Sequence, residues 1–172
     1  MTASTQVAYE DDLDYEIVNG QKEVKMAGAR HGEVGVELIT ELNNYLRKNR
    51  VGKIYTPDTT FQIGGVERLP DIGFISAMRA PADGTPMSKW EIAPDLAIEI
   101  ISPTDIYSKV MNKLREYFAA GVKQVWLVTI EDEQVTIYDS PTQIRVVTAN
   151  QDLTSETLLP GFKCRVSDLF TA

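Results

Sequence analysis

The sequence predicts an α/β domain built around one mixed β-sheet, with helices on its faces. Its 172 residues fit a single domain that is long enough to bury a core. Segments with a helical period at residues 31–49 and 102–120 alternate with groups of short strand-like segments. Residues 96–101 are almost wholly apolar, which is typical of a strand covered on both faces. We expect residues 1–12 to form a flexible acidic N-terminus and residues 13–172 to form one domain.

The first predicted elements are a hairpin and a helix. Asn19-Gly20 is a strong signal for a tight turn, so residues 15–18 and 24–26 are expected to pair. From residue 31 to residue 49 the apolar residues recur with a helical period. Four of them form one stripe that should face the sheet: Val34, Leu38, Leu42 and Tyr45. Gly52 is expected to end this helix.

The remaining elements complete the sheet and supply a second helix. Residues 102–105 break the apolar strand and are expected to cap a helix that Gly121 ends. Residues 159–162 should lead into a short closing helix at 166–170. The other expected strands are short apolar runs bounded by turn residues: 53–55, 59–63, 68–76, 124–130, 134–138 and 145–148. No glycine-rich nucleotide-binding motif follows a strand, so a nucleotide-binding fold is not expected.

The charge balance bears on possible partners. The net charge is −8, and residues 1–23 hold six acids and one base, so −5 of it lies there. An acidic chain is a poor nonspecific partner for duplex DNA, whose backbone is itself anionic. A local cationic groove remains compatible with this total.

Composition also excludes several kinds of site. The single cysteine, Cys164, excludes an internal disulfide and a site of four thiolates. The single histidine, His31, excludes a zinc centre with several histidines. No apolar run approaches the roughly 18 residues of a membrane span, and the first residues lack the pattern of a secretory signal. We therefore expect a soluble cytoplasmic protein with no membrane partner.

Glu99 is the most informative polar position, because it interrupts the apolar strand at residues 96–101. A bare carboxylate buried there would cost several kcal/mol unless it is neutral, paired or bound to a cation. Either a functional site or a salt bridge to a neighbouring Arg or Lys would satisfy it.

Asp71 repeats this pattern, since it follows Pro70 and precedes an apolar strand. If the two strands are neighbours, Asp71 and Glu99 can share a face near one edge of the sheet. Two close carboxylates repel unless a hard cation lies between them, and oxygen ligands suit Mg²⁺ or Mn²⁺. A turn residue at the start of a strand is the alternative for Asp71.

Two lysines of the second helix are candidates for a supporting role. At about 100° per residue, Lys113 falls inside the stripe that contains Val110 and Tyr117. A lysine on the sheet-facing stripe either extends to an edge or meets a carboxylate. Lys109, one turn earlier, flanks the stripe.

His31 lies on the inward stripe of the first helix, in the first turn, where the helix dipole favours anions. It is either a site residue or a core histidine whose hydrogen bonds are satisfied.

Five segments together resemble a known family. They are residues 15–20, 69–75, 94–103, 113–122 and 159–162. In unbroken order over residues 13–170, they are similar to the Uma-two family of restriction endonucleases, abundant in cyanobacteria, within the PD-(D/E)XK nuclease superfamily. The resemblance implies a restriction-endonuclease-like core, in which a central mixed β-sheet is flanked by helices.

The resemblance also implies a metal site and a reaction. Asp71 and Glu99 match the acids that hold Mg²⁺ (or Mn²⁺) in such nucleases. The superfamily's lysine usually lies two residues after that glutamate, where this chain has Ile101; Lys113 matches a lysine that has moved to the following helix. Glu16 matches a recurrent family position with no assigned role.

The function implied is a metal-dependent endonuclease that hydrolyses phosphodiester bonds, with DNA as the expected substrate and a homodimer as the expected assembly. In this scheme Lys113 assists the attacking water, and His31 contacts a phosphate or orients Glu99. The alternative is a catalytically inactive nuclease-fold protein that acts as a nucleic-acid-binding, regulatory or assembly module, and Ile101 and the net charge favour it.

Overall fold

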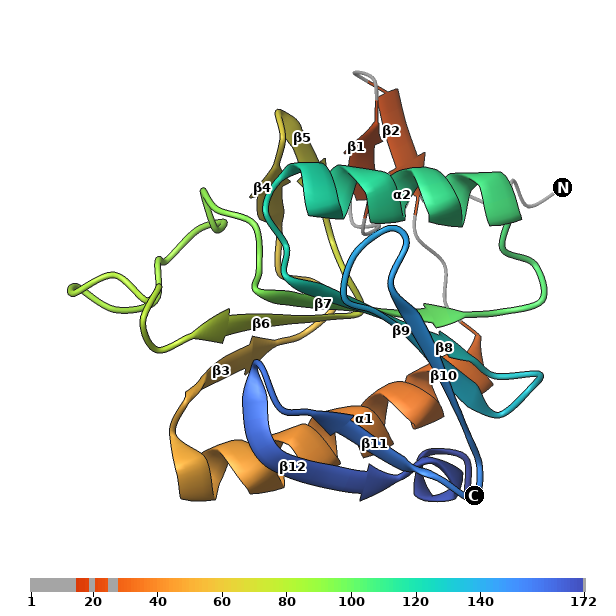
Figure 1. The fold of residues 1–172 in the computed structure, drawn as a ribbon. Helices are drawn as coiled ribbons and strands as arrows, with labels where there is room; N and C mark the ends of the chain where they lie inside the picture. Colours follow the sequence, from red (N-terminus) through yellow and green to blue (C-terminus); the bar gives the residue numbers. More distant parts are fainter. Residues whose placement is uncertain (1–14, 19–20, 25–27, 172) are drawn as a thin grey trace, which may run out of the picture.

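The computed structural model describes residues 15–18, 21–24 and 28–171, and only the backbone of 15–18 and 23–24. The expectation for residues 1–12 lies outside this part of the chain. The described residues form three β-sheets and two long helices (Figure 1). The mixed α/β class predicted from the sequence is confirmed.

The largest sheet has six strands in the order β10-β9-β8-β7-β6-β3. They are β3 (Gly52–Tyr55), β6 (Ile72–Ser76), β7 (Leu96–Ile101), β8 (Gln124–Thr129), β9 (Gln134–Tyr138) and β10 (Ile144–Thr148). β7 and β8 run parallel, and every other neighbouring pair in this sheet is antiparallel. The crossover between the parallel strands passes through helix α2 (Tyr107–Ala119), as a parallel pair requires.

Helix α1 (Ala29–Asn49) packs on one face of this sheet through a buried stripe. The stripe is Val34, Leu38, Leu42 and Leu46. Tyr45 was expected on it, but is only partly buried, and its hydroxyl donates to the Pro160 carbonyl at 2.8 Å.

Gly52 does not stop α1. The helix ends at Asn49 and is capped by Arg50, whose φ of 51° lies in the left-handed region, and Gly52 begins β3. Glycine is required there by close packing, since a Cβ would lie 2.3 Å from the Ile75 carbonyl oxygen.

A second layer of strands covers the opposite face together with α2 (Figure 1). This four-stranded sheet has the order β2-β1-β5-β4. Its strands are β1 (Tyr15–Val18), β2 (Gln21–Val24), β4 (Phe61–Ile63) and β5 (Val66–Arg68). The hairpin predicted around Asn19-Gly20 is confirmed as the β1–β2 pair, although β2 begins at Gln21.

The single strand expected over residues 68–76 is wrong. β5 ends at Arg68 and β6 begins at Ile72, so the chain passes from one sheet to the other through Leu69, Pro70 and Asp71. Proline has no N–H to donate to a ladder, which explains the break. The break leaves Asp71 at the junction of the two sheets.

The C-terminal segment also differs from expectation. Residues 159–162 belong to β12 (Leu159–Arg165), which pairs with β11 (Asp152–Ser155). This hairpin packs with α1, and the closing helix is a 3₁₀ turn, η2 (Val166–Leu169). Gly161 has a φ of 77°, and Pro160 lacks a donor, so the local sequence reads as a turn rather than a strand.

Asp105 does not cap α2. Its Oδ2 accepts the Ser102 N–H at 2.7 Å and the Ser102 hydroxyl at 2.9 Å, and Ile106 is the residue that precedes the helix. Gly121, with a φ of 89°, follows the end of α2 as predicted. In the part of the chain that the structure describes, no helix is long and apolar enough to cross a membrane.

Candidate active site

Glu99 lies in the buried strand β7 and points toward α2. The residue is 7% exposed, and its neighbours along the strand are apolar and buried. Lys113 Nζ donates to Glu99 Oε2 at 3.0 Å, and the Tyr117 hydroxyl donates to Oε1 at 2.5 Å. A buried carboxylate is tolerated when charge and hydrogen bonds satisfy it, which is the situation found here.

The sheet-facing stripe of α2 supplies both of these donors. Tyr117 is fully buried in a second core cluster, which includes Phe61 and Ile63 of β4, Leu114 of α2 and Val125 of β8. The Lys113 side chain, in contrast, is 15% exposed. The two residues are four apart and therefore lie on one face of the helix. The inward placement of Lys113 that the helical angle predicted is confirmed. Its ammonium also lies 6.0 Å from the centre of the Tyr117 ring.

Asp71 lies where β6 begins and is 2% exposed. Its Oδ2 accepts the backbone N–H of Ile100 at 2.7 Å. The same oxygen lies 3.2 Å from His31 Nε2. The carboxylate is thus tied both to β7 and to the first turn of α1.

The strand register relates the two acids. β6 and β7 are antiparallel neighbours, and Ile72 pairs with Ile98. The register ends at this pair, and Asp71, the residue before Ile72, instead accepts the backbone N–H of Ile100, the residue after Glu99. The neighbouring strands that the sequence hypothesis required are therefore present.

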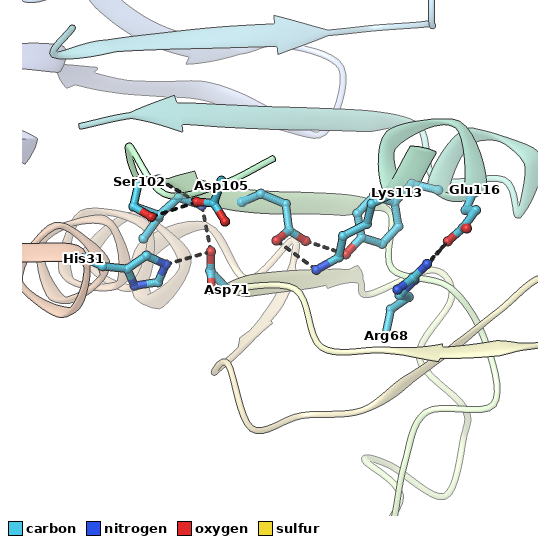
Figure 2. Close-up of polar contacts among 10 residues, drawn as sticks. His31, Arg68, Asp71, Ser102, Asp105, Lys113 and Glu116 are labelled. Atoms are coloured by element: carbon cyan, nitrogen blue, oxygen red, sulfur yellow. Dashed lines mark hydrogen bonds and ion pairs between the residues drawn. The ribbon is translucent and has the colours of Figure 1, made fainter. Parts of the chain in front are cut away.

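The four main candidates form two contacting pairs, His31 with Asp71 and Glu99 with Lys113. β7 links the pairs, because Ile100 follows Glu99 and donates to Asp71. Figure 2 shows His31 facing Asp71, and Lys113 reaching in from α2. The contact of His31 is with Asp71, whereas the sequence hypothesis had it orient Glu99 or contact a phosphate.

Two other candidates are less well defined. Lys109 is an exposed residue of the first turns of α2. The side chain of Glu16 lies outside the described residues, although its backbone belongs to β1.

The donor set fits a hard divalent cation. Asp71 and Glu99 offer carboxylate oxygens, and Mg²⁺ is commonly held by one or two carboxylates while water and substrate phosphates fill its remaining positions. Among the residues that the structure describes, no group of three His, Cys, Asp or Glu side chains forms a complete cage for a metal. Any metal held by Asp71 and Glu99 would therefore depend on water or substrate for its other ligands.

Sequence reasoning missed Tyr117 and the Arg68–Glu116 pair beside this site. Tyr117 was assigned only to the apolar stripe, yet its hydroxyl holds Glu99. Arg68, which is 5% exposed, donates through Nε to Glu116 Oε2 at 2.9 Å and also through Nη2 to the same oxygen. Its position four residues after Lys113 places Tyr117 on the same helix face but does not by itself assign a role to the hydroxyl.

A third buried acid, Asp95, lies just before the first residue of β7, Leu96. It is fully buried, accepts the Ser76 N–H at 2.8 Å, and has Lys123 at 2.9 Å and Arg79 at 3.3 Å. Burial alone would raise the pKa of Asp95, but the hydrogen bonds from Lys123 and Ser76 and the charge of Arg79 hold it below its usual range. Two cations thus balance the charge of this acid.

The six-stranded mixed sheet, with α1 on one face and α2 on the other, forms an α/β core. A family model described as "Putative restriction endonuclease", Uma2, matches residues 4–167. The chain belongs to this family. The recognition made from the sequence segments is confirmed.

A solved structure supports the fold independently. It is the crystal structure of "a putative nuclease belonging to DUF820" from Anabaena variabilis ATCC 29413. The TM-score is 0.81 at 21% sequence identity, and the match covers 92% of this chain and 90% of that one. At this identity the likeness establishes the shared fold. A search of curated proteins gives no match.

Proposed function

We propose that this protein is a metal-dependent endonuclease that hydrolyses phosphodiester bonds in DNA. One observation carries the proposal: the Asp71 carboxylate accepts the backbone N–H of Ile100, the residue after Glu99, whose own carboxylate is paired with Lys113. Membership of a restriction endonuclease family makes phosphodiester hydrolysis the chemistry to test first.

In this proposal each residue of the site has a distinct role. Asp71 and Glu99 would hold Mg²⁺ (or Mn²⁺), and His31 would keep the Asp71 carboxylate in position. The metal would supply charge neutralisation at the phosphate and lower the pKa of a bound water. Lys113 would orient the attacking water or stabilise negative charge in the transition state. Lys109 and Glu16 are supporting candidates.

The direct test is nicking of supercoiled plasmid and single-stranded DNA, with Mg²⁺, Mn²⁺ or a chelator. We expect product only with a metal, and at least about a 100-fold loss of rate in Asp71→Asn and in Glu99→Gln. Asp132→Asn, in the exposed turn between β8 and β9, is the matched control and should cut like the parent chain. Undiminished nicking by Asp71→Asn would refute the assignment.

A second candidate is a nuclease-fold module that binds nucleic acid without cutting it. Ile101 favours this candidate, because the superfamily's lysine usually occupies that position and here the residue is apolar. DNA binding that persists in the absence of any metal-dependent cleavage would support it over the enzyme.

The proposal includes a homodimer, by analogy with nucleases that pair two sites to cut two strands. Analytical ultracentrifugation of the full chain, alone and with duplex DNA, tests this part separately. A monomer in both conditions would remove the dimer and leave the cleavage chemistry to be judged on its own.

A further inference from the structure

Each oxygen of the Glu99 carboxylate carries a hydrogen-bond donor from α2. The Tyr117 hydroxyl donates to Oε1, and the Lys113 ammonium donates to Oε2. A divalent ion that takes an oxygen of Glu99 must therefore replace one of these donors or share its oxygen with it. Which donor yields depends on how freely each can move and on its charge.

The two donors differ in both respects. Tyr117 is fully buried among the side chains of the second core cluster, so its ring cannot turn away without disturbing the packing. Lys113 has a flexible four-carbon stem and is partly exposed. Exchange of its ammonium for a metal ion also keeps a positive charge beside the buried carboxylate, which avoids the cost of leaving that charge unpaired.

We infer that the Lys113 ammonium is an exchangeable counter-ion, which covers Glu99 Oε2 until a divalent ion arrives and then moves aside. Tyr117 is the positioning residue that keeps the carboxylate aimed while this exchange occurs. The inference rests on the proposed function and deepens it, because it assigns opposite effects on metal binding to two contacts of one carboxylate.

Removal of the ammonium should strengthen metal binding. In Lys113→Met the stem is retained, and no counter-ion has to leave Oε2, so we expect Mn²⁺ to bind about tenfold more tightly than in the parent chain. Lys113→Gln, which can still donate a neutral hydrogen bond, should change affinity in the same direction. A lysine with a purely structural role predicts no increase in either variant.

Removal of the hydroxyl should weaken metal binding. Tyr117→Phe keeps the ring in the core but leaves Glu99 without its fixed donor. Loss of a group that orients a metal ligand typically costs 10–100-fold in affinity, and we expect a decrease of that size.

The experiment is a Mn²⁺ titration of the full chain without DNA, in which free Mn²⁺ is followed by electron paramagnetic resonance. Two controls match the changes made. Lys89→Met removes a cation from another Lys–Glu pair, in which Lys89 lies 2.6 Å from Glu67. Tyr45→Phe removes a hydroxyl that donates to a backbone carbonyl. Both controls should bind like the parent chain, and thermal unfolding checks that every variant is folded.

The outcomes separate the inference from the proposed function. If the parent chain binds Mn²⁺ but both Lys113 variants bind equally or more weakly, the exchange is refuted and the metal site stands. Unchanged affinity in Tyr117→Phe refutes the positioning role. No binding by the parent chain or any Lys113 variant overturns the proposed metal site, and the inference with it.

Discussion

The Asp71 carboxylate accepts the backbone N–H of Ile100 at 2.7 Å, and so ties the start of β6 to the strand that carries Glu99. The bond is buried, and it joins two segments that are 29 residues apart in the chain. Asp71 therefore has a part in the fold that is separate from its charge. An amide oxygen could play that part, whereas a methyl group could not.

Substitutions at Asp71 should therefore separate stability from function. Asp71→Asn keeps an acceptor for Ile100, and we expect its free energy of unfolding to lie within about 1 kcal/mol of that of the parent chain. Asp71→Ala leaves a buried N–H unsatisfied and should cost about 1–3 kcal/mol more. Urea unfolding followed by circular dichroism measures both. Equal destabilisation by the two substitutions would show that the Ile100 bond contributes nothing measurable.

The Glu99–Lys113 pair should show strong energetic coupling. Either Glu99→Gln or Lys113→Met leaves one buried charge without its partner and should destabilise the fold by about 3 kcal/mol. In the double variant neither charge remains, so the loss should be smaller than the sum of the two single losses, by about 1–3 kcal/mol. Urea unfolding of the parent chain, the two single variants and the double variant measures this coupling free energy. If the loss of stability in the double variant equals the sum of the two single losses, the two side chains are not energetically coupled.

Asp95 should make stability depend on pH in the acid range. Its pKa is lowered in the folded chain, so its contribution is fully present above the unfolded pKa of about 3.9 and is lost as pH falls through the folded value. At pH 7 we expect Asp95→Asn to cost about 3 kcal/mol, since Lys123 and Arg79 then lack their carboxylate.

The difference in free energy of unfolding between Asp95→Asn and the parent chain should become smaller when it is measured below pH 4. Asp58→Asn, an exposed acid beside β4, provides a comparison with little expected effect at either pH. A gap between Asp95→Asn and the parent chain that is constant from pH 7 to pH 3 would contradict the linkage.

Cys164 should be unreactive while the chain is folded. Burial, assisted by the negative charge of nearby acids such as Glu41, raises the pKa of its thiol to about 12. At pH 8 the thiolate fraction is then on the order of 1,000-fold below that of a free cysteine, and reaction with a thiol reagent should slow at least in proportion. Labelling with and without urea measures the ratio. Rapid labelling of the folded chain would show that β12 opens readily.

The contacts of the candidate site could be predicted wherever one residue broke a pattern. Glu99 stood out because a charge interrupted an apolar strand, and Lys113 because it occupied an apolar stripe. Tyr117 broke no pattern, since an aromatic residue on an inward stripe reads as core. Its hydroxyl acquires a role only through the packing of α2 on β7, which local sequence does not encode.

Much of the fold could be predicted in the same way, and the failures have a common cause. The crossover unit from β7 through α2 to β8 was correct because its period changes sharply. β5 and β6 were merged, and the β11–β12 hairpin was missed, because short strands near proline carry little periodic signal. β5 pairs with β1, which is distant in sequence, and β12 pairs with β11 although its own sequence resembles a turn.

The ammonium beside Glu99 comes from Lys113 of α2, and position 101 of β7 carries an apolar side chain. Ile101 is partly buried and packs against the second core cluster, together with Val110 and Met111 of the helix. The crossover helix thus both carries the ammonium and packs on an apolar surface to which Ile101 contributes. Lengthening or shortening the segment between β7 and α2 would shift that helix along the sheet. The length of this connection therefore governs where the Lys113 ammonium lies relative to Glu99.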